Sequence, residues 1–243
     1  MGIKTDKVVF AVTGTTLLTF LIVSRIGTIW ILYPNVLIAI FLLFYSLWQI
    51  DEDTSLLSNS AIFGCITVLT YAPMDWLFSW KAHLIAYRDP DFFGNVTTPI
   101  AIILNWMVFA TLAAYCYQRL VAIFQTRFET ESDAPKVGRI ATAMLATVIT
   151  GIGAAVGSIV IYGLGGVHLW LWNALRIDHI PQIASVPIFL PLAFLFTFLL
   201  CPYFFGVAGN FLRAQHAGLA GIRCGIFMGA FQFLSFLLFY VSK

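Results

Sequence analysis

The chain consists of long apolar runs separated by short polar segments. A membrane core about 30 Å thick requires roughly 17 to 25 apolar residues per helix, and seven runs approach or reach this length. They lie near residues 8–24, 28–50, 56–79, 98–122, 139–163, 183–205 and 220–241. The pattern predicts an all-α fold: a polytopic membrane bundle of about seven transmembrane helices, forming a single domain over residues 1–243.

The distribution of basic residues predicts the orientation of these helices. If the N-terminus is cytoplasmic, the polar segment 125–138 becomes a cytoplasmic linker and the basic residues divide eight to five between the two sides. The eight are Lys4, Lys7, Arg119, Arg127, Lys136, Arg139, Arg213 and Arg223; the five are Arg25, Lys81, Arg88, Arg176 and Lys243. Because cytoplasmic loops carry the excess of Lys and Arg, we expect a cytoplasmic N-terminus in an inner or plasma membrane. A cleaved signal peptide over residues 1–24 is the alternative, but no small-residue cleavage site follows it.

Composition excludes several classes of protein. Hydrophobic residues make up 60% of the chain and charged residues 10%, with a mean hydropathy of +0.93. Soluble domains carry roughly 45 to 50% hydrophobic residues and about 25% charged residues. The net charge of +2 is spread along the chain, which argues against nucleic-acid binding. Four cysteines fall inside the predicted spans and four histidines are scattered over loops. We therefore expect no disulfide framework, no metal site and no cofactor.

A single acidic residue, Asp75, interrupts the third apolar run. An ionisable group at that depth costs several kcal/mol unless it faces protein or water, so Asp75 requires a partner. Helical spacing places Tyr71, Asp75 and Ser79 on one face, with Trp76 and Trp80 as an adjacent aromatic stripe. Within this run, Pro73 is expected to loosen the helix and to leave space for polar groups.

The fourth run carries a second polar residue at a similar depth. With a rise of 1.5 Å per residue, Asn105 and Asp75 both lie roughly 8 to 11 Å below the same membrane surface, so a helical hairpin would let them meet. Two interpretations remain open. These side chains either fix helix contacts or form a pocket with Asp75, Asn105 and Tyr71 as catalytic residues.

Two loops are candidates for the mouth of such a pocket. The segment after the third run contains Tyr87 and Arg88. The part around Arg88 is either a rim that binds an anionic headgroup or a solvated turn. The segment 168–181 mixes two tryptophans with Arg and His, a composition typical of the membrane interface. Both segments lie on the outer side in the predicted topology. The candidate substrate-binding residues are Trp76, Trp80, Tyr87, Arg88 and Trp106.

Prolines and glycines mark two further features. Pro187, Pro191 and Pro202 fall within the sixth run and predict kinks, which are common in helices that line transporter cavities. Gly153 and Gly157 form a G-x-x-x-G pattern that permits close approach of two helices in lipid. We expect this ridge to serve packing, with oligomerisation through it as a further possibility.

One ordered pattern within residues 75–106 resembles a known family. Asp75, Tyr87, Gly94, Pro99 and Trp106 are similar to the succession of acid, tyrosine, glycine, proline and tryptophan in polytopic carotenoid hydratase-type membrane proteins. Those proteins usually have a glutamate at the position of Asp75, often followed by a histidine. The resemblance implies an apolar isoprenoid substrate and acid chemistry on an alkene, by a carboxyl group kept protonated by apolar surroundings.

Three functions fit these observations. The first is a membrane-embedded enzyme that acts on an isoprenoid or other lipid, with Asp75 as general acid or base. The second is a carrier or channel for a small solute, although one acid without a buried Lys or Arg makes a proton relay of several groups hard to assemble. The third is a noncatalytic subunit of a membrane complex. The activity stays open among these three; we rank lipid or isoprenoid chemistry ahead of transport and expect membrane lipids as the surrounding partners.

Overall fold

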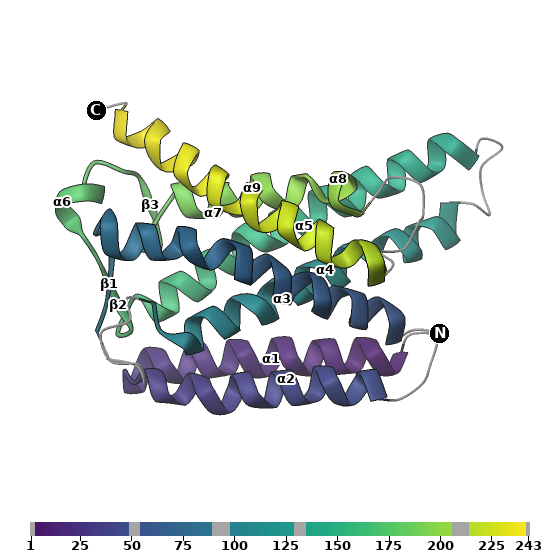
Figure 1. Ribbon diagram of the computed structural model, residues 1–243, viewed down its shortest axis with the longest axis horizontal. Helices are drawn as coiled ribbons and strands as arrows, with labels where there is room; N and C mark the ends of the chain where they lie inside the picture. The colour runs from purple at the N-terminus through teal and green to yellow at the C-terminus, as the bar shows by residue number, and fades with distance from the viewer. Residues whose placement is uncertain (1–2, 49–53, 89–97, 129–134, 206–213, 242–243) are drawn as a thin grey trace.

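The computed structural model describes residues 3–48, 54–88, 98–128, 135–205 and 214–241, and this part of the chain is predominantly helical (Figure 1). The long helices are α1 (Ile3–Ile26), α2 (Leu32–Trp48), α3 (Thr54–Trp76), α4 (Ile100–Phe128), α5 (Pro135–Gly165) and α9 (Ala214–Val241). The shorter ones are η1 (Ile29–Ile31), η2 (Leu77–Lys81), α6 (Ala174–Ile177), α7 (Phe189–Leu199) and α8 (Cys201–Phe205). The all-α architecture agrees with the prediction.

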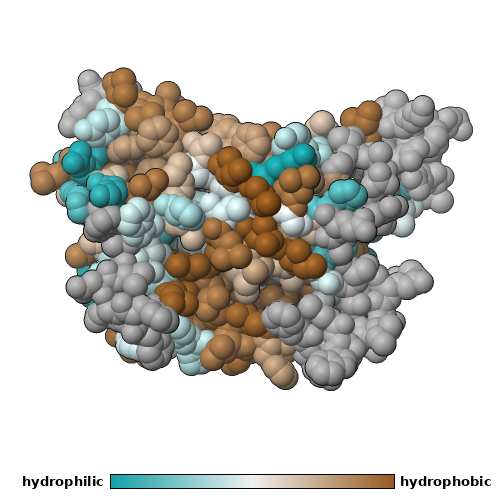
Figure 2. Space-filling view, in the orientation of Figure 1, coloured by the Kyte–Doolittle hydropathy of each residue, from teal (hydrophilic) through white to brown (hydrophobic). Residues whose placement is uncertain are grey.

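The helices have the length and surface of membrane-spanning elements. Five are long and apolar enough to cross a membrane, over Thr5–Ile26, Leu56–Ser79, Ile100–Arg127, Ile140–Gly165 and His216–Val241. Two shorter apolar segments, Ile29–Leu43 and Phe189–Phe205, accompany them. Large apolar side chains such as Phe10 and Leu238 are 77% and 67% exposed, and hydrophobic residues form a broad area across the middle of the face in Figure 2. This is the architecture of a helical integral membrane protein.

Helix α3 lies at the centre of the bundle, packed between α4 and α9. Glycines allow both contacts to be close. A Cβ atom on Gly64 would lie 2.2 Å from Thr111 Oγ1 of α4, and one on Gly225 of α9 would lie 1.9 Å from Thr70 Oγ1. Around this core, α5 packs on α4 and α7, α7 packs on α9, and α1 and α2 lie side by side as an antiparallel pair (Figure 1).

Two small ribbons cover one end of the bundle. Strand β1 (Ile85–Tyr87) follows η2 and pairs antiparallel with β2 (Trp170–Trp172), which follows α5; Ile85 is opposite Trp172 and Tyr87 is opposite Trp170. Strand β3 (Gln182–Ile183) pairs with β4 (Val186–Pro187). Figure 1 shows β1, β2, β3 and α6 together at this end. The loop after the third apolar run and the segment after the fifth therefore lie together.

The predicted span 183–205 does not begin as a helix. Its first residues form the β3–β4 hairpin, and the helix starts at Phe189. Its prolines do not kink one continuous helix: Pro187 ends β4, whereas Pro191 and Pro202 lie in the first turns of α7 and α8. A first-turn proline removes an N–H that has no partner within the helix, so these positions tolerate it.

Helices also cover both ends of the predicted linker 125–138, because α4 continues to Phe128 and α5 begins at Pro135. Residues 129–134 lie outside the described residues.

The two glycines of the G-x-x-x-G pattern lie in α5. A Cβ atom on Gly157 would lie 3.2 Å from Phe109 Cε2 of α4, while one on Gly153 would meet no atom within 4 Å. Gly157 thus serves a contact within the chain, and oligomerisation through the two glycines stays a prediction.

Candidate functional site

Asp75 lies in the last turn of α3 with only 5% of its surface exposed. Its Oδ2 accepts a hydrogen bond of 2.7 Å from Oγ1 of Thr98, which lies two residues before the start of α4. Thr98 Oγ1 also lies 3.2 Å from Ser79 Oγ. A hydroxyl carries one proton, and that of Thr98 is donated to Asp75. The Ser79 hydroxyl donates its proton to the Trp76 carbonyl at 3.2 Å, so Ser79 and Thr98 are in polar contact, while the hydrogen bond that the carboxyl accepts comes from Thr98.

The carboxyl of Asp75 has no basic partner among the described residues. The ion pair in this part of the chain joins Arg119 and Asp6, near the start of α1. Transfer of a lone charge from water into apolar surroundings is costly. Asp75 is thus an acidic group supported by hydroxyl groups and aromatic rings rather than by a cation.

A small hollow lies against the Asp75 side chain. We call it the Asp75 hollow; its volume is about 10 Å³, close to the space required by one water molecule. Its lining comes from α3, η2, β2, α5, α7, α9 and the segment around β1: Asp75, Phe78, Leu84, Ile85, Tyr162, Trp172, Phe189, Leu190 and Gln232. The site is therefore assembled from distant parts of the sequence beneath the β1–β2 ribbon.

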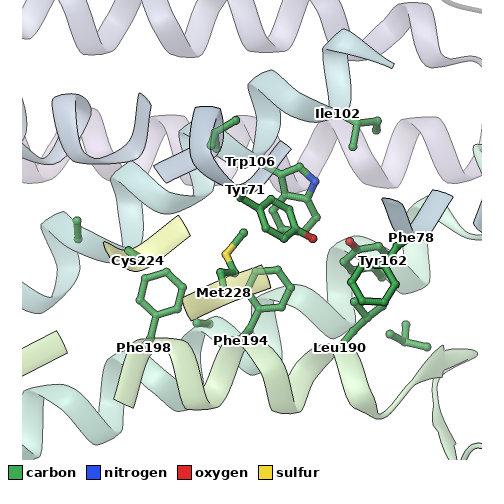
Figure 3. Packing of buried hydrophobic residues seen from close by; sticks show 14 of the residues in the cluster. Tyr71, Phe78, Ile102, Trp106, Tyr162, Leu190, Phe194, Phe198, Cys224 and Met228 are labelled. Carbon is green, nitrogen blue, oxygen red and sulfur yellow. The ribbon is translucent and has the colours of Figure 1, made fainter. Parts of the chain in front are cut away.

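Tyr71 lies one helical turn before Asp75 and is almost fully buried. Its hydroxyl donates a hydrogen bond of 2.5 Å to Gln232 Oε1 of α9. Its ring makes an edge contact with Trp106, with centroids 6.3 Å apart. Trp106 in turn stacks on Phe194 at 5.1 Å. Figure 3 shows this aromatic cluster and the hydroxyl of Tyr162 turned toward that of Tyr71. The predicted face of Tyr71, Asp75 and Ser79 is therefore buried in the bundle.

The expected contact between Asp75 and Asn105 is wrong. Asn105 is buried, but its Nδ2 donates to the Ala101 carbonyl in its own helix at 2.7 Å, and its Oδ1 has no partner in the described part of the chain. It lines a second hollow, the Asn105 hollow, also of about 10 Å³. Thr98, which precedes α4, bonds to Asp75 instead. Tyr162 lines both hollows.

The predicted substrate-binding residues take different positions. Trp106 and Tyr87 line the Asn105 hollow. Burial raises the pKa of Tyr87 well above its usual value, so its phenol stays neutral. The Trp76 side chain is 40% exposed on the outside of α3 and lines neither hollow, and Arg88 is exposed beyond β1. The side chain of Trp80, like Gly94 of the family pattern, lies outside the described residues.

Several residues at the site carry little signal in the sequence. Gln232 is an amide within the apolar run of α9, so the depth argument that identified Asp75 also applies to it. Thr98 and Tyr162 belong to residue types that are common in membrane helices and are identified only by the fold. Trp170 and Trp172 belong to the segment predicted to lie at the membrane interface and at the mouth of a pocket, and the structure has them lining the two hollows.

No group of three or more His, Cys, Asp or Glu side chains that can hold a metal ion occurs within the described ranges. Comparison with protein-family models, curated proteins and solved structures found no match for this chain.

Proposed function

We propose that this protein is a membrane-embedded enzyme that performs acid-base chemistry on an isoprenoid or another apolar lipid. The observation that carries the proposal is the buried Asp75 carboxyl, which has no basic partner in the described residues and borders a hollow lined mainly by apolar and aromatic groups. A neutral acid in such surroundings suits proton transfer to an apolar substrate. The similarity of Asp75, Tyr87, Pro99 and Trp106 to the carotenoid hydratase-type pattern supports the same chemistry.

The proposed reaction is the addition of water to an alkene. The protonated Asp75 gives its proton to one alkene carbon, and the electron pair of the C=C bond forms the new C–H bond. Water then adds to the cationic carbon through its oxygen and returns one proton to the Asp75 carboxylate. The nearby rings, including Tyr162, Trp172 and Phe189, stabilise positive charge through their faces. Thr98 holds the carboxyl in place throughout.

The reaction requires the site to open. The Asp75 hollow holds about one water molecule, so an isoprenoid chain enters only when the packing above or beside it changes. The β1–β2 ribbon contributes to the hollow through Ile85 and Trp172. We propose that displacement of this ribbon admits the substrate, and that the described arrangement is the closed state.

The test is production of the protein in a bacterial host that makes an acyclic carotenoid, followed by mass spectrometry of the extracted pigments. The wild-type chain should yield a product heavier by one water molecule. Asp75→Asn preserves the shape of the side chain but cannot donate a carboxyl proton, so the product should fall by about 100- to 10,000-fold.

Asp178→Asn is the matched control, because Asp178 is an exposed acid beside α6. It should leave the yield unchanged. A full yield from Asp75→Asn, in protein that migrates as a folded monodisperse species, would falsify the catalytic role of Asp75. Absence of any product from the wild-type chain would reject hydration of acyclic carotenoids.

A carrier for a small solute is the second candidate function. It is favoured by the interruption at Leu200, between α7 and α8, because broken helices often line transport sites in membrane proteins. Solute flux through liposomes containing the purified protein separates the two functions. Uptake that persists in Asp75→Asn, without lipid conversion by the wild type, favours the carrier.

The membrane topology is part of the proposal. We propose that Ile29–Leu43 and Phe189–Phe205 also cross the membrane, which gives seven crossings with the N-terminus in the cytoplasm. The alternating course of the apolar helices along the long axis in Figure 1 supports this count. Cysteine labelling from each side of sealed vesicles tests it: single cysteines replacing Lys7 and Leu175 should react from opposite sides.

A further inference from the structure

The Asn105 hollow has a polar character that the proposed function does not use. Its lining combines the amide of Asn105, the indoles of Trp106 and Trp170 and the phenols of Tyr87 and Tyr162 with apolar neighbours such as Phe20. It lies between α1, α4 and α5, under the end of the β1–β2 ribbon. Its volume of about 10 Å³ corresponds to one small group of the size of water.

Three residues that line this hollow each have a buried polar atom without a hydrogen-bond partner in the described part of the chain: Asn105 Oδ1, Trp106 Nε1 and Trp170 Nε1. These residues are only 8%, 5% and 2% exposed. A buried polar atom left without a partner is destabilising because it has lost its hydrogen bond to water, and native proteins rarely contain several together. The grouping of these three residues around one hollow therefore indicates a missing polar ligand.

The orientation of the Asn105 amide follows from its other contact. Its Nδ2 donates to the Ala101 carbonyl at 2.7 Å, so the atom left over is the oxygen, an acceptor. The indole nitrogens of Trp106 and Trp170 are donors only. Figure 3 shows the nitrogen of Trp106 on the side of its ring toward Ile102, which also lines the hollow.

These atoms select the chemistry of the ligand. A cation would face indole N–H donors, and an anion would face the oxygen of Asn105. A hydroxyl group both donates and accepts, and a water molecule has the size of the hollow. We propose that the Asn105 hollow binds one hydroxyl group, which donates to Asn105 Oδ1 and accepts from Trp106 Nε1. The hydroxyl belongs either to water or to the polar end of an isoprenoid alcohol.

This inference goes beyond the proposed function, because it concerns binding and holds for an enzyme or a carrier alike. Tyr162 lines both hollows, so the bound hydroxyl lies across this side chain from the Asp75 hollow. Under the proposed function, this is the place for the water that adds to the substrate or for the hydroxyl of a lipid.

The test uses the full chain in lipid nanodiscs, with ¹⁵N-labelled indoles. Trp106→Phe identifies the N–H signal of Trp106 among those of the seven tryptophans. If water is the ligand, this signal in the wild type shows a cross-peak to a long-lived water molecule. If an alcohol is the ligand, farnesol binds about tenfold more tightly than its hydrocarbon farnesene, as expected for about 1.4 kcal/mol of hydrogen bonding.

Asn105→Leu removes the acceptor with little change in size and should abolish the water cross-peak or the preference for farnesol. Asn35→Leu is the matched control, because the Asn35 amide bonds to Thr16 elsewhere in the bundle; it should change neither signal.

The proposal is overturned if the folded wild type shows no water cross-peak and binds both probes equally. It is also overturned if Asn105→Leu leaves the observed signal intact. Asp75→Asn should keep the signal, so failure of the proposed catalysis is distinguished from failure of this site.

Discussion

Two acidic residues at opposite ends of the bundle have opposite surroundings. Near the start of α1, Asp6 accepts hydrogen bonds from Arg119 Nε at 3.1 Å, from Arg119 Nη2 at 2.9 Å and from Tyr115 Oη at 2.7 Å. Near the end of α3, Asp75 accepts a bond of 2.7 Å from Thr98 and has no basic partner in the described residues. Both are acids within apolar helices, yet only one is neutralised by a cation.

Under the proposed function, the difference separates a structural acid from a reactive one. The bidentate pair of Asp6 and Arg119 ties α1 to α4 and fixes both side chains in one geometry. Asp75 is more deeply buried and is held by neutral groups, so its proton can be exchanged without breaking an ion pair. The comparison predicts that changes at Asp6 alter stability, whereas changes at Asp75 alter chemistry.

The largest effect is expected from exchanging each acid for its amide. Asp75→Asn should reduce turnover by about 100- to 10,000-fold while the melting temperature in detergent stays close to that of the wild type. Asp6→Asn should show the reverse pattern: normal turnover and a lower melting temperature. Parallel thermal scans and product analyses measure both quantities. If the Asp6→Asn variant lost turnover at a temperature where this variant is still folded, the contrast between the roles of Asp6 and Asp75 would be rejected.

The second prediction concerns Arg119→Met, which keeps much of the apolar stem and removes the charge. Asp6 then loses its cation. Because the side chains of Arg119 and Asp6 are 21% and 28% exposed, solvent compensates in part, and we expect a loss of about 2 kcal/mol in the free energy of unfolding. Denaturant unfolding of the purified protein measures it. Recovery of stability in the double variant Arg119→Met with Asp6→Asn is the expected control result.

A smaller effect is expected at Thr98. Thr98→Val removes the hydroxyl that bonds to Asp75 and keeps the shape of the side chain, so turnover should fall by about tenfold, the value of one hydrogen bond of about 1.4 kcal/mol. Thr111→Val on α4 is the matched control, because its hydroxyl bonds to the Met107 carbonyl one turn earlier. Equal activities of the two variants would show that Thr98 does not orient the carboxyl.

The smallest effect is expected at Tyr115. Tyr115→Phe removes one donor to Asp6 and leaves the pair with Arg119 intact, so the free energy of unfolding should fall by about 1 kcal/mol. Turnover should be unchanged. The same denaturant titration measures the loss, and a loss larger than that of Arg119→Met would mean that the phenol, rather than the guanidinium, is the main partner of Asp6.

Hydropathy was sufficient to predict the helical membrane architecture, because apolar runs of this length form helices in lipid. It failed at the start of the sixth run, since an apolar hairpin and an apolar helix have the same hydropathy. The turn between β3 and β4 uses Ala184 and Ser185 at φ values of +50° and +65°. It lacks the Asn-Gly signal that identifies such turns in a sequence.

The candidate site was predictable only in part. Asp75 was identified because a carboxyl is rare in an apolar run, and its burial agrees with the expectation that it is sheltered. Its partner was not, because the depth argument selected Asn105, whereas the carboxyl accepts a hydrogen bond from Thr98, which precedes α4. The contributions of Tyr162 and Gln232 depend on how α5 and α9 pack against α3, which no local pattern encodes.

Labelling with an apolar carbodiimide tests the central contrast most directly, because this reagent dissolves in the membrane and reacts with protonated carboxyl groups. Peptide mapping by mass spectrometry then gives the extent of modification at Asp75 and at Asp6 in the same sample. The proposed roles predict rapid modification of Asp75 and slow modification of Asp6. Turnover should fall in proportion to the fraction of Asp75 that is modified. Faster modification of Asp6, or full turnover after complete modification of Asp75, would contradict them.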